Sequence, residues 1–498
     1  MRIFEPILAL LLLTGCSAAR APEPVVTGAA PAKAAPSAAT TAENGLPGTA
    51  DWKIGRRGGE HEIEGFADRV SVPPGADFRL FVSTTRPSWH VEAFRIGWYG
   101  GKRARLLWTS PAQTGTRQAA ARIDPATLTV TAPWKPSLTV PTRGWPAGSY
   151  LLRLTASSGA QRYVPITVRS PDAAGRLVVL NATTTWQAYN GWGGHDLYGG
   201  PTGFDSRSRA VSFDRPYDLD GAEKFRVHEL DAIVLAEKQG LPLAYATDND
   251  LHRDGGLLHG ARGLITLGHD EYWSTAMWRR TEQARDRGVN LAFLGANAVN
   301  RHIRFAPTRL GEDRLVICYK SADDPIGRTD PGETTVDWRI GTPPRPESAL
   351  IGIQYNCFPA DGAYVVRRPG NWLFAGTGAT KGKAYPGLMG PETDGLNRSG
   401  PIPRPIEVLS HSPIRCGSGS ATHADSTYYT TKSGAGVFAS GGMRFTCALR
   451  GPRCGHGVTW ESRAFVAGVI ANLLKGFAAG PAGFAHPAED DLDSVSGF

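Results

Sequence analysis

Hydrophobic and polar residues follow two different patterns along the chain, and the pattern changes near residue 170. From about residue 51 to residue 170, short segments of alternating apolar and polar residues are separated by turns rich in proline and glycine. These segments lie at residues 68–72, 78–83, 90–96, 128–130 and 150–154. Alternation with a period of two, without a helical stretch, predicts an antiparallel β-sandwich of immunoglobulin-like type over residues 51–170.

Beyond residue 175 the apolar residues form continuous runs, each followed by a polar or helical stretch. The runs lie at residues 177–180, 241–247, 263–268 and 289–295. Continuous apolar runs are typical of strands buried on both faces, and a helix between successive strands makes them parallel. The sequence therefore predicts a doubly wound α/β domain over residues 175–478.

Three further segments complete the predicted α/β domain and its surroundings. A helix over residues 220–240 is expected to break near His228, and a closing helix is expected over residues 461–475. Residues 305–430 show no single period, so they are predicted to form an insertion that covers the strand ends. Residues 480–498 are predicted to be a flexible tail.

Each predicted strand of the α/β domain ends in polar residues. These are Thr183 to Thr185, Asp248 with Asp250, His269 to Glu271, and Asn297. Because the carboxyl ends of parallel strands meet at one edge of the sheet, where ligands bind, we expect these groups to converge. The alternative for the densest group, His269 to Glu271, is that it only stabilises the helix that begins at Ser274.

The residue types at this edge favour metal or general-base chemistry. The turn after residue 268 contains no serine or cysteine, so covalent acyl transfer is not expected there. Glu271 is a hard oxygen ligand, and His269 is a base or a second ligand. Tyr189 and Tyr198 follow the first strand and offer phenolate oxygens, although a tyrosine is more often a packed aromatic than a ligand.

The N-terminus predicts a protein of the cell envelope that faces outside the cytoplasm. An apolar run at residues 7–13 is too short to span a bilayer and ends at the sequence LTGC, positions 13–16. This sequence resembles a bacterial lipobox, in which the cysteine, here Cys16, is acylated and anchors the mature protein to the membrane. An ordinary cleaved secretory signal is the alternative. Residues 17–48 are rich in Ala, Pro, Ser and Thr and are predicted to be a disordered tether.

The net charge indicates which kinds of partner to expect, and the cysteine content bears on the disulfides that an oxidising compartment would allow. The net charge of +8 is spread over 498 residues without a Lys/Arg run, so nucleic acid is not expected as a partner. In an oxidising compartment the five cysteines beyond Cys16 are expected to form disulfides and to leave one thiol unpaired. The predicted pairs are Cys447 with Cys454 and Cys318 with Cys357.

Four short motifs resemble the C-terminal domain of the N,N-dimethylformamidase large (beta) subunit family. They are TWQAYN at residues 185–190, DRPY at 214–217, GHDEYW at 268–273 and FLGAN at 293–297. The resemblance implies a β-sandwich joined to a glutamine-amidotransferase-like α/β domain. It also implies hydrolysis of a small amide by Lewis-acid activation at a mononuclear Fe(III) ion, which two tyrosines and one glutamate hold beside an assisting histidine.

Carried over residue by residue, the resemblance assigns the iron ligands and the histidine. Tyr189, Tyr198 and Glu271 match the ligands, and His269 matches the histidine that moves the proton. Tyr217 is the alternative to Tyr198 as the second tyrosine.

The resemblance leaves one acidic residue and the function itself open. Glu461 is only a candidate for a further acidic residue near the C-terminus. The chain departs from the family in its export signal, its long insertion and the absence of any sign of a small partner subunit, which puts the substrate in doubt. The alternative function is a non-catalytic envelope lipoprotein that binds a glycan or a protein through a degenerate α/β domain. Convergence of the three ligand oxygens on one point would favour the enzyme.

Overall fold

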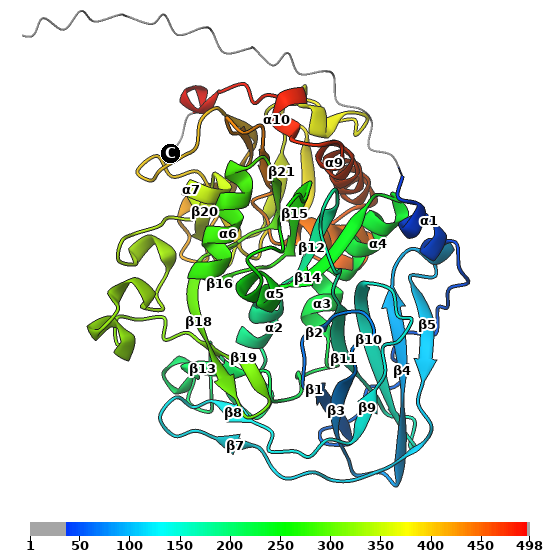
Figure 1. Ribbon diagram of the computed structural model, residues 1–498. Helices are drawn as coiled ribbons and strands as arrows, with labels where there is room; N and C mark the ends of the chain where they lie inside the picture. The colour runs from blue at the N-terminus through cyan, green and yellow to red at the C-terminus, as the bar shows by residue number, and fades with distance from the viewer. Residues whose placement is uncertain (1–35, 496–498) are drawn as a thin grey trace, which may run out of the picture.

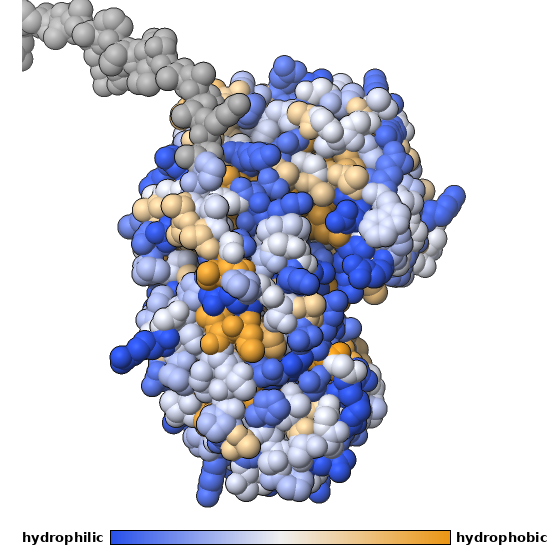
Figure 2. Space-filling model, turned by 90° about the vertical axis from the view of Figure 1, so that its right-hand side faces the viewer, coloured by the Kyte–Doolittle hydropathy of each residue, from blue (hydrophilic) through white to orange (hydrophobic). Residues whose placement is uncertain are grey.

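The computed structural model describes residues 36–495, and Figure 1 shows their arrangement. The N-terminal strands lie at one end of the molecule, and the larger sheet with its helices lies at the other. The predicted lipobox at Cys16 and the first part of the predicted tether fall outside the described residues. The space-filling view in Figure 2 shows a mostly hydrophilic face on which hydrophobic residues are exposed in patches, the most conspicuous of them near the middle.

The N-terminal strands form two sheets that share a core. The smaller sheet has the order β1 (Ile63–Ala67), β3 (Phe78–Thr84) and β9 (Leu138–Val140). The larger has the order β2 (Ser71–Val72), β11 (Gln161–Val168), β10 (Gly148–Ala156), β4 (Ser88–Ile96) and β5 (Ala104–Thr109), with β6 (Gln113–Thr114) beside β4. Side chains from both sheets, among them Phe78, Val91 and Leu152, form one buried cluster. An immunoglobulin-like topology stays a prediction.

One expected N-terminal strand is placed differently. The strand expected at residues 128–130 is β8 (Val130–Thr131), which pairs with β7 (Arg122–Ile123) outside both sheets. Leu128 has a φ of 54°, in the left-handed region, which turns the backbone before the strand begins.

A seven-stranded sheet forms the centre of the second part. Its order is β14 (Leu243–Thr247), β12 (Leu177–Asn181), β15 (Gly263–Gly268), β17 (Asn290–Gly295), β26 (Gly436–Ala439), β25 (Ala421–Thr430) and β24 (Ile406–Arg415). Strands β14 to β26 are parallel, whereas β25 and β24 are antiparallel. Residues 406–415 and 421–430, which were expected to belong to an insertion, therefore extend the sheet. A glutamine-amidotransferase-like fold stays a prediction, as do the domain boundaries.

Helices cover both faces of this sheet because successive residues of its strands point to opposite sides. Leu177 and Val179 of β12 pack in the cluster that contains α4 (Leu230–Lys238) and α9 (Trp460–Ala479). Val178 and Leu180 pack in the cluster that contains α5 (Asp248–Arg253) and α6 (Thr275–Asp286). The expected break near His228 is present, because one residue, Glu229, separates the end of α3 (Glu223–His228) from the start of α4.

Among the described residues, α9 is the one helix long and apolar enough to cross a membrane. Half of its most apolar window is buried, and its side chains Phe465, Val469 and Leu473 belong to the main core cluster. The helix therefore has the burial of a core helix.

The remaining elements surround the sheet. A four-stranded sheet has the order β13 (Ala210–Ser212), β19 (Gly311–Ile317), β18 (Arg301–Thr308) and β16 (Tyr272–Ser274). Two strand pairs are β20 (Gln354–Cys357) with β23 (Thr393–Gly395) and β21 (Gly362–Val365) with β22 (Ala384–Met389). The short helices are α2 (Thr183–Ala188), α7 (Ser348–Ile351), α8 (Arg444–Cys447) and α10 (Ala482–Ala485). The 3-10 helices are η1 (Tyr99–Gly101), η2 (Phe204–Ser206), η3 (Pro325–Arg328), η4 (Pro331–Glu333), η5 (Trp338–Ile340), η6 (Trp372–Phe374), η7 (Ala448–Cys454) and η8 (Leu492–Ser494).

Both ends of the described chain are more ordered than the composition indicated. Within the predicted tether, α1 (Ala38–Asn44) is a helix, and Glu43 accepts hydrogen bonds from Tyr99 and Arg105. Within the predicted tail, Leu492 is buried and Asp491 forms an ion pair with Arg367. These specific polar contacts hold segments whose own apolar surface is small.

The disulfide pairing differs from the prediction at one of its two pairs. Cys447 is bonded to Cys454, as expected. Cys357 is bonded to Cys416 rather than to Cys318, which is buried and free. Cys357 ends β20 and Cys416 follows β24, and these two strand ends are adjacent because Ala360 forms a bridge with Cys416. Cys318 follows β19 in a different sheet.

Candidate metal centre

Three oxygen-bearing side chains converge at the carboxyl end of the central sheet. Tyr189 directly follows α2, which begins after β12, and Glu271 lies between β15 and β16. The hydroxyl Oη of Tyr189 is 2.7 Å from that of Tyr198, and the two hydroxyls are each 2.8 Å from Oε2 of Glu271. The three atoms therefore form a nearly equilateral triangle, which brings together all three ligands that the family resemblance implied.

The size of this triangle fits a single small cation. When an octahedral ion has bonds of about 2.0 Å, its neighbouring ligand oxygens lie about 2.8 Å apart. Phenolate and carboxylate oxygens are hard donors and suit a ferric ion. Within residues 36–495 no group of three His, Cys, Asp or Glu side chains is arranged to hold a metal, and the present cluster differs because two of its donors are tyrosines.

The protonation of the three groups follows from their burial and mutual charge. Burial and then the charge of Glu271 raise the pKa of Tyr189 and of Tyr198 well above the usual value. Burial also raises the pKa of Glu271, but His269, Arg301 and Lys320 together outweigh it and lower that pKa to about 2. The tyrosines are therefore neutral donors to an ionised carboxylate, and a bound cation would compete with their protons.

His269 lies at the edge of the triangle. Its Nε2 is 3.1 Å from the hydroxyl of Tyr189 and 3.4 Å from Oε2 of Glu271, and its Nδ1 is 3.4 Å from the carbonyl oxygen of Ala296. Burial lowers the pKa of His269, but the negative charges of Glu392 and Glu271 outweigh burial and raise it. The imidazole is thus held where it can exchange a proton with a group at the centre.

Helix stabilisation at Ser274 does not account for the polar cluster at residues 269–271. Ser274 itself caps α6 by accepting a hydrogen bond from the backbone N–H of Met277. The side chains of His269 and Glu271 face the tyrosines instead, and Asp270 accepts a hydrogen bond from Nε1 of Trp273. Two members of the three-residue cluster therefore belong to the oxygen site, and one is structural.

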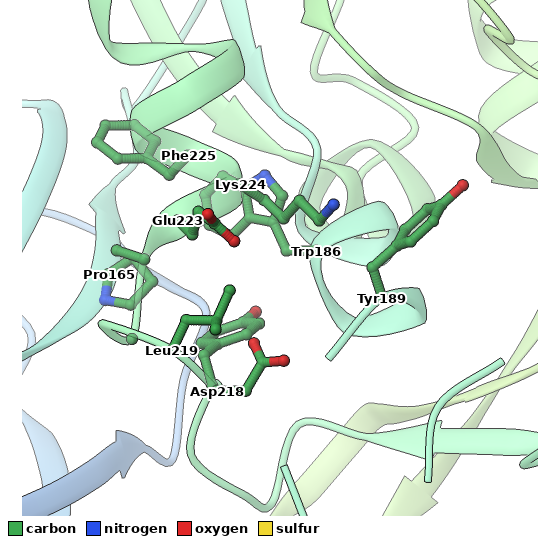
Figure 3. A pocket seen from close by; sticks show the side chains of 11 residues that line it. Pro165, Trp186, Tyr189, Asp218, Leu219, Glu223, Lys224 and Phe225 are labelled. Atoms are coloured by element: carbon green, nitrogen blue, oxygen red, sulfur yellow. The ribbon is translucent and has the colours of Figure 1, made fainter. Parts of the chain in front are cut away.

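The two tyrosine alternatives are separated in space. Tyr198 takes part in the triangle, whereas Tyr217 packs edge-on against Trp186 at a centroid distance of 6.3 Å. Tyr217 lines a cavity of about 110 Å³ together with the ring of Tyr189. In Figure 3 the hydroxyl of Tyr189 points away from this cavity, and the side chain of Lys224 extends from the cavity wall toward the tyrosine.

The acidic residue beside His269 is Glu392, and Glu461 is not part of the site. Glu461 lies at the start of α9 with 61% of its side chain exposed, and it pairs with Lys383 at 2.8 Å. Glu392 is 9% exposed, its charge acts on His269 and on Tyr189, and its Oε2 has no hydrogen-bond partner within residues 36–495. It precedes β23 in a segment without sequence periodicity, so no pattern marked it.

Three further side chains at the centre were not identified from the sequence. The Tyr272 hydroxyl donates to that of Tyr198 at 2.7 Å, and Nε of Arg301 lies 3.3 Å from Oε1 of Glu271. Nζ of Lys320 lies 3.2 Å from the centre of the Tyr198 ring and has no hydrogen-bond partner in the part of the chain that the structure describes. Only Tyr272 lies inside a motif that the sequence marked.

Two glycines allow the strand ends that carry the site to approach each other. A Cβ on Gly295, the last residue of β17, would lie 1.6 Å from the carbonyl oxygen of Gly268. Gly268 ends β15 with a φ of 64°, and a Cβ there would lie 2.6 Å from Cβ of His228. Because His269 and Glu271 follow Gly268 directly, this contact fixes the direction in which they leave the sheet.

Asp394 near the centre gives a pH-dependent prediction. Burial raises its pKa to about 8, although it accepts a hydrogen bond from the backbone N–H of Asn297. The folded protein binds this proton more tightly than the unfolded chain does. This tighter proton binding adds to the free energy of unfolding. The contribution is fully present below about pH 4 and is lost as the pH rises toward 8.

We therefore expect Asp394→Asn to gain stability relative to the wild type between pH 5 and pH 8, by up to a few kcal/mol. The asparagine still accepts from Asn297 and carries no charge at either pH. Thermal unfolding midpoints at both pH values measure the difference, with the exposed Asp51→Asn as control. If the unfolding midpoint of the variant differs from that of the wild type by the same amount at pH 5 and at pH 8, the raised pKa of Asp394 is contradicted.

Comparison with known sequences places the chain in a family. The sequence model of the family N,N-dimethylformamidase beta subunit-like, C-terminal, matches residues 90–458, and the chain belongs to this family. This confirms the resemblance inferred from the four motifs.

Other comparisons add no argument. No curated protein matches the chain significantly. A cycloisomaltooligosaccharide glucanotransferase of Paenibacillus sp., complexed with cycloisomaltoheptaose, is 13% identical over 24% of this chain and 15% of its own length, with a TM-score of 0.15. The chain thus matches only a small part of that enzyme, and a likeness at this TM-score says nothing about fold or function.

Proposed function

We propose that this chain is an exported, lipid-anchored hydrolase that cleaves the C–N bond of an amide with the help of Fe(III). The observation that carries the proposal is the oxygen triangle of Tyr189, Tyr198 and Glu271, with edges of 2.7 to 2.8 Å. Membership of the dimethylformamidase-like family supports the same reaction class. The two disulfides favour an oxidising compartment and so favour export.

Some residues of the site would bind the ion, and others fix the position of its carboxylate ligand. Tyr189, Tyr198 and Glu271 would hold the ion, which when bound supplies Lewis acidity toward the amide carbonyl. Arg301 and the hydroxyl of Thr185, which accepts from the backbone N–H of Glu271 at 2.9 Å, fix the position of Glu271.

His269 is the residue that would transfer the proton. Hydrolysis adds one water across the C–N bond, so a proton must reach the departing amine nitrogen. His269 is placed to hold that proton at Nε2, and the charge of Glu392 stabilises the protonated imidazole.

A non-catalytic envelope lipoprotein is disfavoured by the same geometry. That alternative would be supported if one of the tyrosines were buried in apolar packing with its hydroxyl away from Glu271. Both hydroxyls instead contact the carboxylate.

The test is amine release from simple amides by the iron-loaded protein. We expect N,N-dimethylformamide to yield dimethylamine and formate, or acetamide to yield ammonia and acetate, in equal amounts. His269→Gln should lower the rate at least 100-fold, since general acid–base catalysis contributes about 10²- to 10⁴-fold. The exposed Glu461→Gln serves as the matched control and should keep the wild-type rate. If the iron-loaded protein hydrolyses none of the small amides tested, the proposal is overturned.

A further inference from the structure

The two tyrosines of the triangle are stacked on each other. The rings of Tyr189 and Tyr198 have centroids 4.3 Å apart, and their planes are inclined by 22°. Their hydroxyls lie side by side and both contact Oε2 of Glu271. Each ring therefore has one face against the other tyrosine and one face that points away from the pair.

A lysine ammonium lies over each of these rings. Nζ of Lys224, on α3, is 4.5 Å from the centre of the Tyr189 ring, and Figure 3 shows this side chain extending toward Tyr189. Nζ of Lys320, which follows β19, is 3.2 Å from the centre of the Tyr198 ring. Rings 4.3 Å apart leave no room for an ammonium between them, so Lys320 lies on the outer face of Tyr198. Both distances are within the range of about 6 Å in which a ring attracts a cation.

Neither ammonium has a carboxylate as its direct partner. Nζ of Lys320 is buried without a hydrogen-bond partner among the described residues, and Lys224 forms no ion pair or hydrogen bond with any of them. The charge of Lys224 acts on Asp218 and on Glu392, but neither is paired with it. Removing an ammonium from water without an ion pair is costly. The tyrosine rings are thus the closest contacts that stabilise these two charges.

The backbone at Lys320 is strained. Its φ of 59° lies in the left-handed region, which a long side chain rarely adopts. The N–H of Lys320 donates to the carbonyl oxygen of Thr335 at 2.9 Å, which holds this conformation in place. Strained residues of this kind concentrate at functional sites, so the strain agrees with a function for this ammonium.

The two ammonium groups gain a counter-charge when the tyrosines hold a cation as phenolates. Two phenolates and one carboxylate together cancel the charge of a ferric ion, which would leave the centre a weak Lewis acid. An ammonium over a phenolate ring draws negative charge away from the ligand oxygen, and this attraction is strong where little water is present. The centre would then keep more of its ability to polarise an amide carbonyl.

We infer that Lys224 and Lys320 are positioning residues that act through the two tyrosines. They hold the stacked pair in its ligand form and keep the centre a strong Lewis acid. The inference rests on the proposed ferric centre and adds two residues to it. Without the ion the lysines lie over neutral rings, so their positive charge is compensated best in the iron-loaded protein.

The first measurement is the visible absorption spectrum of the iron-loaded full chain beside its Lys224→Met and Lys320→Met variants. Methionine has a similar length and no charge. Without the ammonium an electron leaves the phenolate more easily, so the phenolate-to-iron band should move to longer wavelength. The affinity for iron should fall about 10- to 100-fold, as for other groups that support a ligand.

Two further variants serve as controls for the spectrum. Lys224→Arg keeps the positive charge and should keep the wild-type band. Lys383→Met removes an ammonium that lies 5.1 Å from the ring centre of Tyr385, a tyrosine outside the centre. This matched loss of a contact between lysine and tyrosine should leave the band and the iron affinity unchanged.

The second measurement separates this role from a merely structural one. Lys320→Met removes a buried charge without a partner, so it should raise the melting temperature of the iron-free protein. The further rise that iron produces should be smaller than in the wild type, because weaker binding stabilises less. A merely structural lysine would instead lower the melting temperature of the iron-free variant and leave the rise with iron unchanged.

Each outcome decides between the inference and the proposed function. A band at the wild-type wavelength in both methionine variants, with unchanged iron affinity, would overturn the inference while the ferric centre stands. The predicted shifts without amide hydrolysis would support the inference and overturn the proposed function.

If the wild type binds no iron, the proposed function is overturned, and the melting comparison is made with Ga³⁺, a redox-inactive ion of the same charge. A smaller rise in both methionine variants than in the wild type would then support the inference. An equal rise, or no rise in any of them, would overturn it.

Discussion

Glu271→Gln is expected to remove iron from the protein and to abolish amide hydrolysis. The substitution keeps the shape of the side chain but takes the negative charge from the one ionised oxygen donor of the triangle. Replacing a group that merely supports a ligand typically costs 10- to 100-fold in metal affinity. Loss of a ligand charge should cost at least that much, so iron content after gel filtration should fall at least about tenfold.

The variant must be shown to be folded, because Arg301 and His269 lose a buried counter-charge. Circular dichroism and the melting temperature establish this, and Glu461→Gln is the matched control on an exposed glutamate. A folded Glu271→Gln protein that retains wild-type iron would contradict the role of Glu271 as a ligand.

Gly295→Ala is expected to destabilise the whole sheet edge. Its new Cβ would lie 1.6 Å from the carbonyl oxygen of Gly268, and because this neighbour is backbone, the strands themselves must move apart. Overpacking of this kind costs about 3 kcal/mol, and here it also displaces His269 and Glu271. We expect a lower melting temperature together with loss of iron binding.

Gly370→Ala is the control for this substitution, because a Cβ at this exposed glycine would have no atom within 4 Å. Equal melting temperatures for the Gly295 and Gly370 variants would show that β15 and β17 do not approach each other this closely.

Local sequence patterns predicted the elements whose burial is uniform. The continuous apolar runs became the buried strands β12 and β15, and the helix break near His228 is present. The sequence did not indicate that β24 and β25 join the same sheet, because residues 305–430 show no single period and because the added pairs, β25 with β26 and β24 with β25, are antiparallel. Disulfide pairing was also beyond local reasoning, since it depends on which strand ends meet.

The same contrast holds for the site, where residues with a local sequence signal were predicted and residues without one were not. Glu271 and His269 were found from their place after a buried strand, and Tyr198 needed the family resemblance, because nothing local distinguishes it from a packed aromatic. Glu392 and Lys320 were missed because they reach the centre from a segment without periodicity. The choice of Glu461 as a candidate for the further acidic residue was wrong, because its side chain faces solvent at the start of α9.

The most direct measurement is the iron content and visible absorption spectrum of the protein beside its Tyr189→Phe variant. The phenylalanine keeps the ring but removes the oxygen that lies 2.7 Å from Tyr198 and 2.8 Å from Glu271. We predict nearly one iron per chain and a phenolate-to-iron charge-transfer band that weakens or disappears in the variant. A wild-type protein that stays colourless and free of iron after incubation with ferric salt would contradict this prediction.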